Sequence, residues 1–432
     1  MLRIGIRRED KSHWEARTPL IPAAVERLIK QQGIEVFVQT SPHRAFKEAQ
    51  YQAAGAKIVD SLSDCPIIMG IKEIPPEKIE HDKTYVYFSH TIKGQKGNMP
   101  ALRALLKQHC QLIDYERIVD DKNRRLVFFG NYAGMAGMID SLWALGQRLQ
   151  NEGIASPFGK VQPAHRYRDV AHAKQELAKI GEEIRKQGLP AQLRPFVVGF
   201  AGYGQVSQGA QEVYDVLPIE TVQPDQLASL PPKPDVCYKV VFREEHMVQR
   251  RDASAPFDLQ EYYKNPERYG PRFAPHVPHL TVLMNCIYWE PKYPRLVTID
   301  QLKELYAQPA PPRLRVIGDI SCDLNGSVEC TVKSTKPDDP VFVYEPAGAA
   351  VRDGVAGKGP VILAVDFLPC ELPVDSSGFF TRCLEPFMPA LAIADFRRGL
   401  KECGLPAELR RATIVCQGEL TPDYSYLNKF LA

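Results

Sequence analysis

The chain has 432 residues, which is too long for one ordinary hydrophobic core and predicts two domains. Its hydrophobic fraction of 44% and charged fraction of 25% are typical of globular proteins, and its formal net charge of +2 gives no reason to expect nucleic acid as a partner. No apolar run reaches the roughly eighteen residues of a transmembrane helix. The ten cysteines form no C-x-x-C pair. We therefore expect no membrane span, no metal site, no leader segment and a cytoplasmic protein with reduced thiols.

The first 130 residues alternate apolar runs with amphipathic segments, as strands and helices do in an α/β domain. Pro22 lies at the expected start of the first helix, where proline fits the first turn. The expected helices are residues 22–32, 45–54 and 100–110. The expected strands are residues 2–6, 34–39, 58–59, 66–71, 84–89, 111–116 and 124–129.

Two long helices, at residues 131–149 and 379–399, flank the rest of the chain. Between them we expect a helix at 170–187 and strands at 196–198, 219–222, 236–242, 280–288, 314–319, 341–344 and 361–365, and after them a helical or hairpin tail at 407–432. This order predicts two Rossmann-like α/β domains with parallel sheets, separated by a cleft. The first domain is discontinuous, with residues 1–130 completed by 376–432, and residues 131–375 form a dinucleotide-binding domain.

One stretch has the form of a strand, a glycine turn and a helix: Phe196-Val-Val-Gly-Phe-Ala-Gly-Tyr-Gly-Gln-Val-Ser-Gln-Gly-Ala210. Gly202 and Gly204 would allow a tight turn and let the backbone approach a pyrophosphate, whose charge meets the N–H groups of a helix N-terminus. Ser207 stands where the usual pattern has a third glycine. A purely structural turn is the alternative.

Lys72 and His90 each follow a strongly apolar strand immediately. In a parallel sheet both side chains would reach the same crevice, where an ammonium and an imidazole make a workable acid–base pair. The alternatives are a solvated strand end for Lys72 and a helix cap for His90.

Arg17 and Arg125 are candidates for holding carboxylates, because a guanidinium pairs with them bidentately. Glu116 ends its expected strand as Lys72 does, and could pair with that lysine or with a substrate ammonium. For each of the three, an ordinary salt bridge is the alternative.

Asp319 and Asp323 frame the end of another strand and could face a nicotinamide or a substrate, with a turn-forming role as the alternative. In NAD-binding units an acidic residue binds the 2′-hydroxyl of the ribose. The sequence after residues 219–222 has no clear equivalent of this residue. Arg243 is near enough in sequence to hold a 2′-phosphate. The residues leave NAD against NADP open.

The chain resembles the lysine–ketoglutarate reductase half of the animal and plant aminoadipic semialdehyde synthases, saccharopine dehydrogenases of the lysine-forming type that are related to alanine dehydrogenase and transhydrogenase. The resemblance rests on motifs along nearly the whole chain: Gly70-Ile-Lys-Glu73, Phe88-Ser-His-Thr-Ile-Lys93, Leu112-Ile-Asp-Tyr-Glu116, Tyr132-Ala-Gly-Met-Ala-Gly137, Gly204-Gln-Val-Ser-Gln-Gly-Ala210, Lys264-Asn-Pro-Glu-Arg-Tyr269, Ile287-Tyr-Trp-Glu290 and Gly318-Asp-Ile-Ser-Cys-Asp323.

This resemblance implies an enzyme that condenses lysine with 2-oxoglutarate and reversibly reduces the imine to saccharopine, with NADPH or alternatively NADH. It implies acid–base roles for Lys72 and His90, and assigns the remaining functional residues in two groups. The substrate-binding residues are Arg17, Glu116, Arg125, Asp319 and Asp323, and the cofactor-binding residues are Gly202, Gly204, Gln205, Val206, Ser207 and Arg243. An alanine dehydrogenase-like enzyme and a non-catalytic nucleotide-binding regulator are the alternatives. The oligomeric state, the physiological direction and any separate second dehydrogenase stay open.

Overall fold

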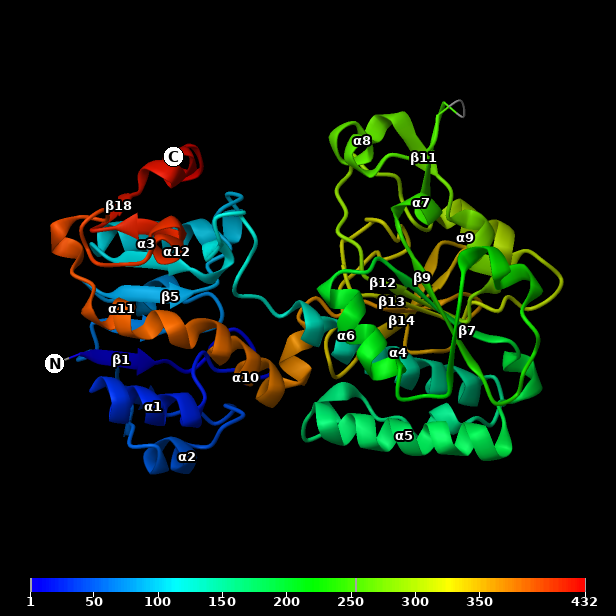
Figure 1. Cartoon of the computed structure of the whole chain (residues 1–432), viewed down its shortest axis with the longest axis horizontal. Coiled ribbons are helices and arrows are strands. Elements are labelled where there is room, and N and C mark those ends of the chain that lie inside the picture. Colours follow the sequence, from blue (N-terminus) through cyan, green and yellow to red (C-terminus); the bar gives the residue numbers. More distant parts are fainter. Residues whose placement is uncertain (1, 253–254, 432) are drawn as a thin grey trace. The chain divides into compact units, whose positions relative to one another are not determined.

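The computed structural model describes residues 2–252 and 255–431 of the chain, which divides into two compact units. Unit 1 runs up to Phe129 and resumes at Pro373, and unit 2 runs from Gly130 to Leu372 (Figure 1). Among the described residues, no helix combines the length and the apolar composition that a membrane crossing requires.

Unit 1 is built on an eight-stranded sheet with the strand order β18-β17-β6-β5-β4-β1-β2-β3. The six strands from β6 to β3 are parallel, and β17 and β18 are antiparallel additions. The strands are β1 (Arg3–Ile6), β2 (Glu35–Gln39), β3 (Lys57–Val59), β4 (Ile67–Met69), β5 (Thr84–Tyr87), β6 (Gln111–Asp114), β17 (Thr413–Cys416) and β18 (Glu419–Leu420). The helices are α1 (Pro22–Gln32), α2 (Glu48–Ala53), α3 (Met99–Lys107), α10 (Pro373–Leu384), α11 (Met388–Ile393), α12 (Ala407–Ala412) and α13 (Asn428–Leu431).

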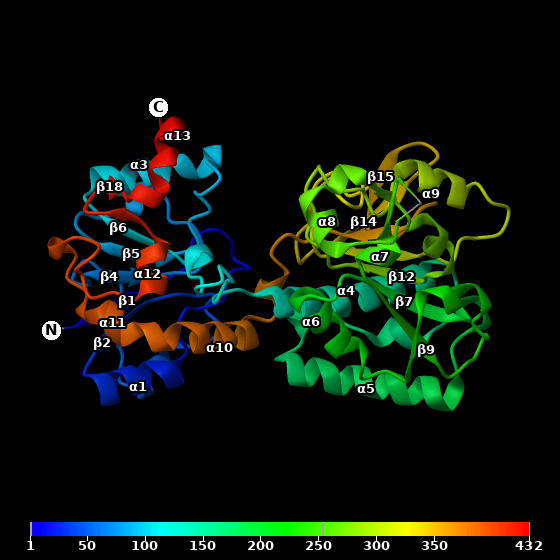
Figure 2. The ribbon, with the colours of Figure 1, turned by 45° about the horizontal axis from the view of Figure 1, so that its top comes forward.

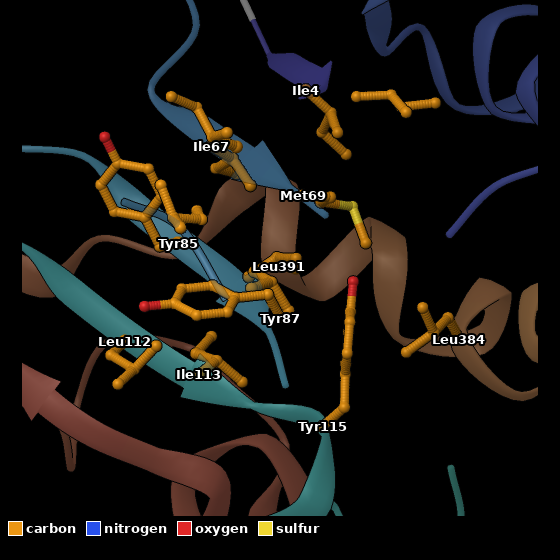
Figure 3. Close-up of a cluster of buried hydrophobic side chains, with 14 of the residues drawn as sticks. Ile4, Ile67, Met69, Tyr85, Tyr87, Leu112, Ile113, Tyr115, Leu384 and Leu391 are labelled. Atoms are coloured by element: carbon orange, nitrogen blue, oxygen red, sulfur yellow. The ribbon is translucent and has the colours of Figure 1, made fainter. Parts of the chain in front are cut away.

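The C-terminal segment completes the core of unit 1. Figure 3 shows Leu384 of α10 and Leu391 of α11 with the buried side chains of the central strands, among them Met69 and Tyr87. All four of these side chains are at most 1% exposed. The first 129 residues therefore lack part of their own hydrophobic core.

Two expected elements of unit 1 are wrong. Residues 124–129 form no strand, because β17 from the distant C-terminal segment pairs with β6 and takes that place in the sheet. The expected helix 379–399 is broken after α10 into the 3₁₀ helix η11 (Glu385–Phe387) and α11. Pro386 and Pro389 lie at these breaks, and a proline removes a helical N–H and crowds the preceding turn.

Unit 2 has a second eight-stranded sheet, with the order β15-β14-β16-β13-β12-β7-β9-β8. The strands from β16 to β8 are parallel, and β14 and β15 run antiparallel at one edge. The strands are β7 (Phe196–Ala201), β8 (Ile219–Val222), β9 (Cys237–Phe242), β12 (Val282–Asn285), β13 (Val316–Asp319), β14 (Val341–Glu345), β15 (Ala350–Asp353) and β16 (Val361–Leu363), and a separate hairpin joins β10 (Val248–Arg250) and β11 (Tyr269–Pro271). The helices are α4 (Gly130–Asn151), α5 (Val170–Gln187), α6 (Gln205–Tyr214), α7 (Glu244–Met247), α8 (Leu259–Lys264) and α9 (Ile299–Tyr306).

Helices cover both faces of this second sheet, as Figures 1 and 2 show. Helices α4, α5 and α6 pack against the face that carries Phe196 and Val198. The opposite face, which carries Val197, packs against the region of α8 and α9. Because both faces are buried, the parallel strands are almost continuously apolar, which is why their sequence shows runs rather than alternation.

Candidate active site

The first group of expected site residues lies at the carboxyl edge of the unit 1 sheet. Lys72 follows β4 and His90 follows β5, and these two strands are parallel neighbours. Glu116 lies just beyond β6, in the 3₁₀ helix η3 (Tyr115–Arg117) rather than at a strand end as expected. The parallel strands β4, β5 and β6 thus deliver a lysine, a histidine and a carboxylate to one edge of one sheet.

His90 is held by a carboxylate that the sequence analysis did not single out. Its Nδ1 lies 2.7 Å from Oε1 of Glu73, which also accepts from Lys11 Nζ at 2.8 Å. Burial alone would raise the pKa of Glu73, but the hydrogen bonds from His90 and Lys11 outweigh it and lower that pKa to about 2. An ionised Glu73 accepts the Nδ1 proton, which leaves Nε2 as the nitrogen that exchanges protons with other groups. The signal for Glu73 was its position directly after Lys72 at the same strand end.

Lys72 lies in a partly buried setting of mixed charge. The backbone N–H groups of Ile71 and Lys72 donate to the two oxygens of Glu9, at 2.7 and 2.9 Å. Burial lowers the pKa of Lys72, and the positive charge of Arg17 lowers it further, while Glu15 and Glu73 act in the opposite direction. A lysine in this setting can exchange a proton nearer to neutral pH than an exposed one.

Arg17, a candidate for holding substrate carboxylates, lies in a buried ion pair. Its side chain is buried and pairs bidentately with Glu15, with Nε 2.7 Å from Oε1. The guanidinium also lies over the ring of Phe129, at 4.3 Å. In this arrangement Arg17 acts on Lys72 through its charge, and its nearest carboxylate is internal.

Arg125 and Glu116 form an ion pair with each other. Arg125 is exposed, and half of its side chain is open to solvent, so its guanidinium remains accessible beside Glu116. The turn that carries Glu116 is capped by the buried Asp114, whose Oδ1 accepts from the Glu116 backbone at 2.8 Å while Oδ2 accepts from Ser89. Asp114 therefore joins the end of β6 to the residue that precedes His90.

The glycine turn of unit 2 connects β7 to α6. Gly202 has a φ of +93°, which suits glycine, and Gly204 caps the helix. A Cβ on Gly204 would meet no heavy atom within 4 Å, so space is open in front of the helix N-terminus, which Gln205 and Val206 begin. This geometry fits a pyrophosphate against the first N–H groups of α6.

Ser207 is fully buried, and its hydroxyl accepts from Gln211 at 3.0 Å. It therefore faces the protein interior. Close packing of α6 on α4 is made by Gly209 and Gly134: a Cβ on Gly209 would lie 2.0 Å from the carbonyl oxygen of Asn131. Helices α4 and α6 consequently cross in direct backbone contact.

A cavity of about 510 Å³ opens beside the glycine turn. Its lining is rich in tyrosine and consists of Gly202, Tyr203, Gly204, Glu244, Met247, Tyr262, Tyr263, Cys286, Ile287, Tyr288 and Tyr293. Glu244 accepts a hydrogen bond from Tyr263 at 2.6 Å. The shape and the flat aromatic walls can accommodate a nucleotide base.

Arg243 lies directly after β9, and β9 is the strand paired with β7. The expected second strand, β8, lies instead at the sheet edge beyond β9, so the residues around Glu220 are displaced from the ribose-reading position. The exposed guanidinium of Arg243 lies over the ring of Tyr203 in the glycine turn, at 4.8 Å. A cation, Arg243, and an acid, Glu244, thus both follow the strand end where NAD-binding domains carry an acid.

Asp319 is placed inside unit 2 rather than at an open site. It is 1% exposed and accepts hydrogen bonds from Asn285 Nδ2 at 2.7 Å and Thr331 Oγ1 at 2.6 Å. Burial raises its pKa to about 6. Asp323 is exposed, and Tyr288 is 72% exposed and lines the cavity. In this structure Asp319 secures the loop after β13.

No cluster of three or more histidine, cysteine or acidic side chains suited to a metal ion occurs within residues 2–252 and 255–431.

The fold and the two groups of residues define a class of protein. Residues 5–136 match the family described as alanine dehydrogenase/PNT, N-terminal domain. An L-alanine dehydrogenase structure superimposes with a TM-score of 0.63 at 17% identity over 100% of both chains, and a transhydrogenase from Sinorhizobium meliloti with 0.53 at 13% identity over 98% of this chain and 99% of that one. The chain is an α/β protein of two Rossmann-like domains, which confirms the expected fold class.

The resemblance noted from the sequence is confirmed. The chain is 39% identical to the alpha-aminoadipic semialdehyde synthase of Arabidopsis thaliana over 98% of its own length and 41% of that protein, and 36% identical to the mitochondrial one of Rattus norvegicus over 99% and 47%. It spans less than half of these two relatives. A saccharopine dehydrogenase [NAD(+), L-lysine-forming] of Candida glabrata is 27% identical over 87% of this chain and 88% of that one. Because the rat protein is described as mitochondrial, the cytoplasmic location stays a prediction.

Proposed function

We propose that the chain is a reductase that condenses L-lysine with 2-oxoglutarate and reduces the resulting imine to saccharopine, using a nicotinamide cofactor. The observation that carries the proposal is similarity along nearly the whole chain: 36–39% identity to alpha-aminoadipic semialdehyde synthases over 98–99% of this chain. The relation to a lysine-forming saccharopine dehydrogenase of comparable length points to the same chemistry.

The reaction needs a neutral amine as nucleophile and two proton transfers at the carbinolamine before water leaves. Lys72 is suited to take a proton from the ammonium of the lysine substrate, because burial and Arg17 lower the pKa of its own ammonium. His90, with Nδ1 held by Glu73, presents Nε2 for the transfer that expels water. Glu73 would stabilise the imidazolium form of His90 while this proton is held.

The two substrates together carry three carboxylates. Exposed cations near the carboxyl edge of the unit 1 sheet are therefore candidates to bind them. Arg125 is an exposed arginine beside Glu116, and we propose that it binds a substrate carboxylate, with Glu116 as the group that the substrate displaces or shares. Arg17, which is buried on Glu15, sets the charge around Lys72.

The glycine turn and the tyrosine-lined cavity of unit 2 would hold the cofactor through Gly202, Gly204 and the first residues of α6. A bound nicotinamide cofactor supplies the hydride that reduces the imine. We further propose a preference for NADPH, because Arg243 offers a guanidinium to a 2′-phosphate at the end of the strand paired with β7.

The proposal is tested by initial rates. Oxidation of NADPH should require lysine and 2-oxoglutarate together, and saccharopine should appear in equal amount. Rapid oxidation with pyruvate and ammonia would instead favour an alanine dehydrogenase-like activity. Tight NADPH binding without turnover of any oxo acid and amine would favour a regulatory protein.

A further inference from the structure

The C-terminal segment of unit 1 lies against the loop that carries His90. This segment consists of the 3₁₀ helix η13 (Pro422–Leu427) and α13, and Figure 2 shows α13 beside α3, which follows that loop in the chain. Tyr426 Oη donates to the carbonyl oxygen of Ile92 at 2.7 Å. The ring of Phe430 covers Gly94 so closely that a Cβ there would lie 2.5 Å from it. We call Tyr424, Tyr426 and Phe430 the tail clasp.

The loop under the clasp has an uncommon backbone. His90 has a φ of +49° and Gly94 a φ of +68°, and both values lie in the left-handed region. A histidine adopts this conformation at a cost and keeps it where its surroundings fix it. Asn98 contributes by donating to the His90 carbonyl oxygen at 3.0 Å. The remaining contacts on the outer side of the loop include those of Tyr426 and Phe430.

Tyr424 extends the clasp to the neighbouring turn, which carries Glu116. Its hydroxyl accepts from Arg117 Nε at 3.0 Å and donates to the Arg411 carbonyl oxygen at 2.7 Å. Arg117 directly follows Glu116 in η3. One short segment thus touches both the His90 loop and the turn that carries Glu116.

We propose that Tyr426 and Phe430 are positioning residues for the reductase reaction, an inference that rests on the proposed function. They hold residues 91–94 so that the His90 imidazole stays on Glu73 with Nε2 presented. They touch neither His90 nor the catalytic edge directly. The packing of the segment itself is carried by Leu427, which is fully buried in the unit 1 core, whereas Tyr426 is 43% exposed and Phe430 is only partly buried. Removing the two aromatic side chains therefore loosens the loop and spares the core.

The test compares Phe430→Ala and Tyr426→Phe with the wild type and with the control Ser425→Ala. The hydroxyl of Ser425 donates to the Pro422 carbonyl oxygen within the same turn. Loss of one hydrogen bond or one ring contact should lower kcat about fivefold to tenfold and change the shape of the pH–rate profile, while KM for NADPH and Tm stay unchanged. Phe430→Leu, which still covers Gly94, should restore most of the rate. Ser425→Ala should match the wild type.

Two measurements without substrate separate this proposal from the proposed function. In Phe430→Ala, amide exchange of residues 91–94 should accelerate, and ¹⁵N NMR of the His90 ring should show loss of the single Nδ1–H tautomer. Unchanged exchange and an unchanged tautomer in both variants would overturn the positioning role, whatever the rates. A wild type inactive with lysine and 2-oxoglutarate would instead overturn the proposed function, and the exchange result would still decide the clasp. If Phe430→Ala does not fold, Tyr426→Phe, which loses one surface hydrogen bond, decides it alone.

Discussion

His90 Nδ1 and Glu73 Oε1 are 2.7 Å apart, and the two residues come from the ends of adjacent parallel strands. The pair fixes which ring nitrogen is free for proton transfer. The pKa of Glu73 is about 2, so Glu73 stays ionised and keeps this arrangement at neutral pH.

Replacement of Glu73 by glutamine should test this pair. An amide oxygen can still accept the Nδ1 proton, but the negative charge that stabilises the imidazolium is lost. We expect kcat to fall on the order of tenfold to a hundredfold, within what general acid–base catalysis contributes. Steady-state kinetics measure this loss. An unaltered kcat would remove Glu73 from the mechanism.

Lys72→Met removes the amine and keeps the length of the side chain. Turnover should fall about 10²- to 10⁴-fold if Lys72 transfers a proton, whereas NADPH binding, measured by fluorescence titration, should be nearly unchanged. His90→Gln should behave in the same way. Lys30→Met, on the exposed surface of α1, is the matched control. Wild-type turnover in both Lys72→Met and His90→Gln would contradict the assigned roles.

Arg243→Ser should weaken NADPH binding far more than NADH binding. Loss of a charged hydrogen bond corresponds to roughly tenfold to a hundredfold in KM for NADPH, and NADH has no 2′-phosphate to lose. Arg168→Ser, an exposed arginine paired with Asp169, should leave both values unchanged. Equal losses for the two cofactors would place the 2′-phosphate elsewhere or assign Arg243 to general nucleotide binding.

Glu371 and Asp140 form a buried acidic pair in unit 2. Both side chains are buried and interact with each other, and His165 Nδ1 lies 3.3 Å from Glu371 Oε2. Burial raises the pKa of Glu371 to about 8, and burial together with repulsion by Glu371 raises the pKa of Asp140 well above its usual range. Two buried carboxyl groups that interact in this way titrate as a coupled pair and favour one shared proton.

This pair predicts a dependence of stability on pH. The folded state keeps a proton on Glu371 that the unfolded chain, with a pKa of 4.5, has already released, so stability falls as pH rises from about 4.5 to about 8. Burial lowers the pKa of His165, which has the opposite effect but only toward acidic pH. Glu371→Gln should therefore gain stability relative to the wild type between pH 6 and 8 and level off above it, as measured by urea unfolding. Parallel curves for the two proteins would argue against the shared proton. Glu182→Gln, on the exposed face of α5, is the control.

Much of the fold follows from local sequence patterns. The glycine turn after β7 and the placement of Lys72 and His90 at strand ends depend on short apolar runs, which the sequence displays directly. Two features depend on pairing between distant segments: β17 beside β6, and β9 between β7 and β8. A single sequence carries little information on which strands pair, and for this reason residues 124–129 were expected in the sheet and the ribose-reading position was sought after β8.

In the candidate site, too, some features follow from local sequence and others depend on contacts between separate segments. Glu73 is adjacent to Lys72 in the chain, but its contact with His90 exists only because β4 and β5 are neighbours. Asp319 ends a strand as expected, yet its three donors, Asn285, Thr331 and the Cys322 backbone, come from the end of β12 and from loops, and no periodicity predicts these contacts. Strand ends are visible in a sequence, and side-chain partners across strands are not.

The discontinuity of unit 1 has a consequence for the order of folding during synthesis. Its core and the β17 position require α10, α11 and β17, which leave the ribosome only after all of unit 2 has been made. Unit 2 is continuous and can close its own core first, while the nascent first segment waits with an unpaired β6 edge. Slow steps in refolding should therefore report assembly of unit 1, and chaperone dependence should concentrate on its N-terminal half.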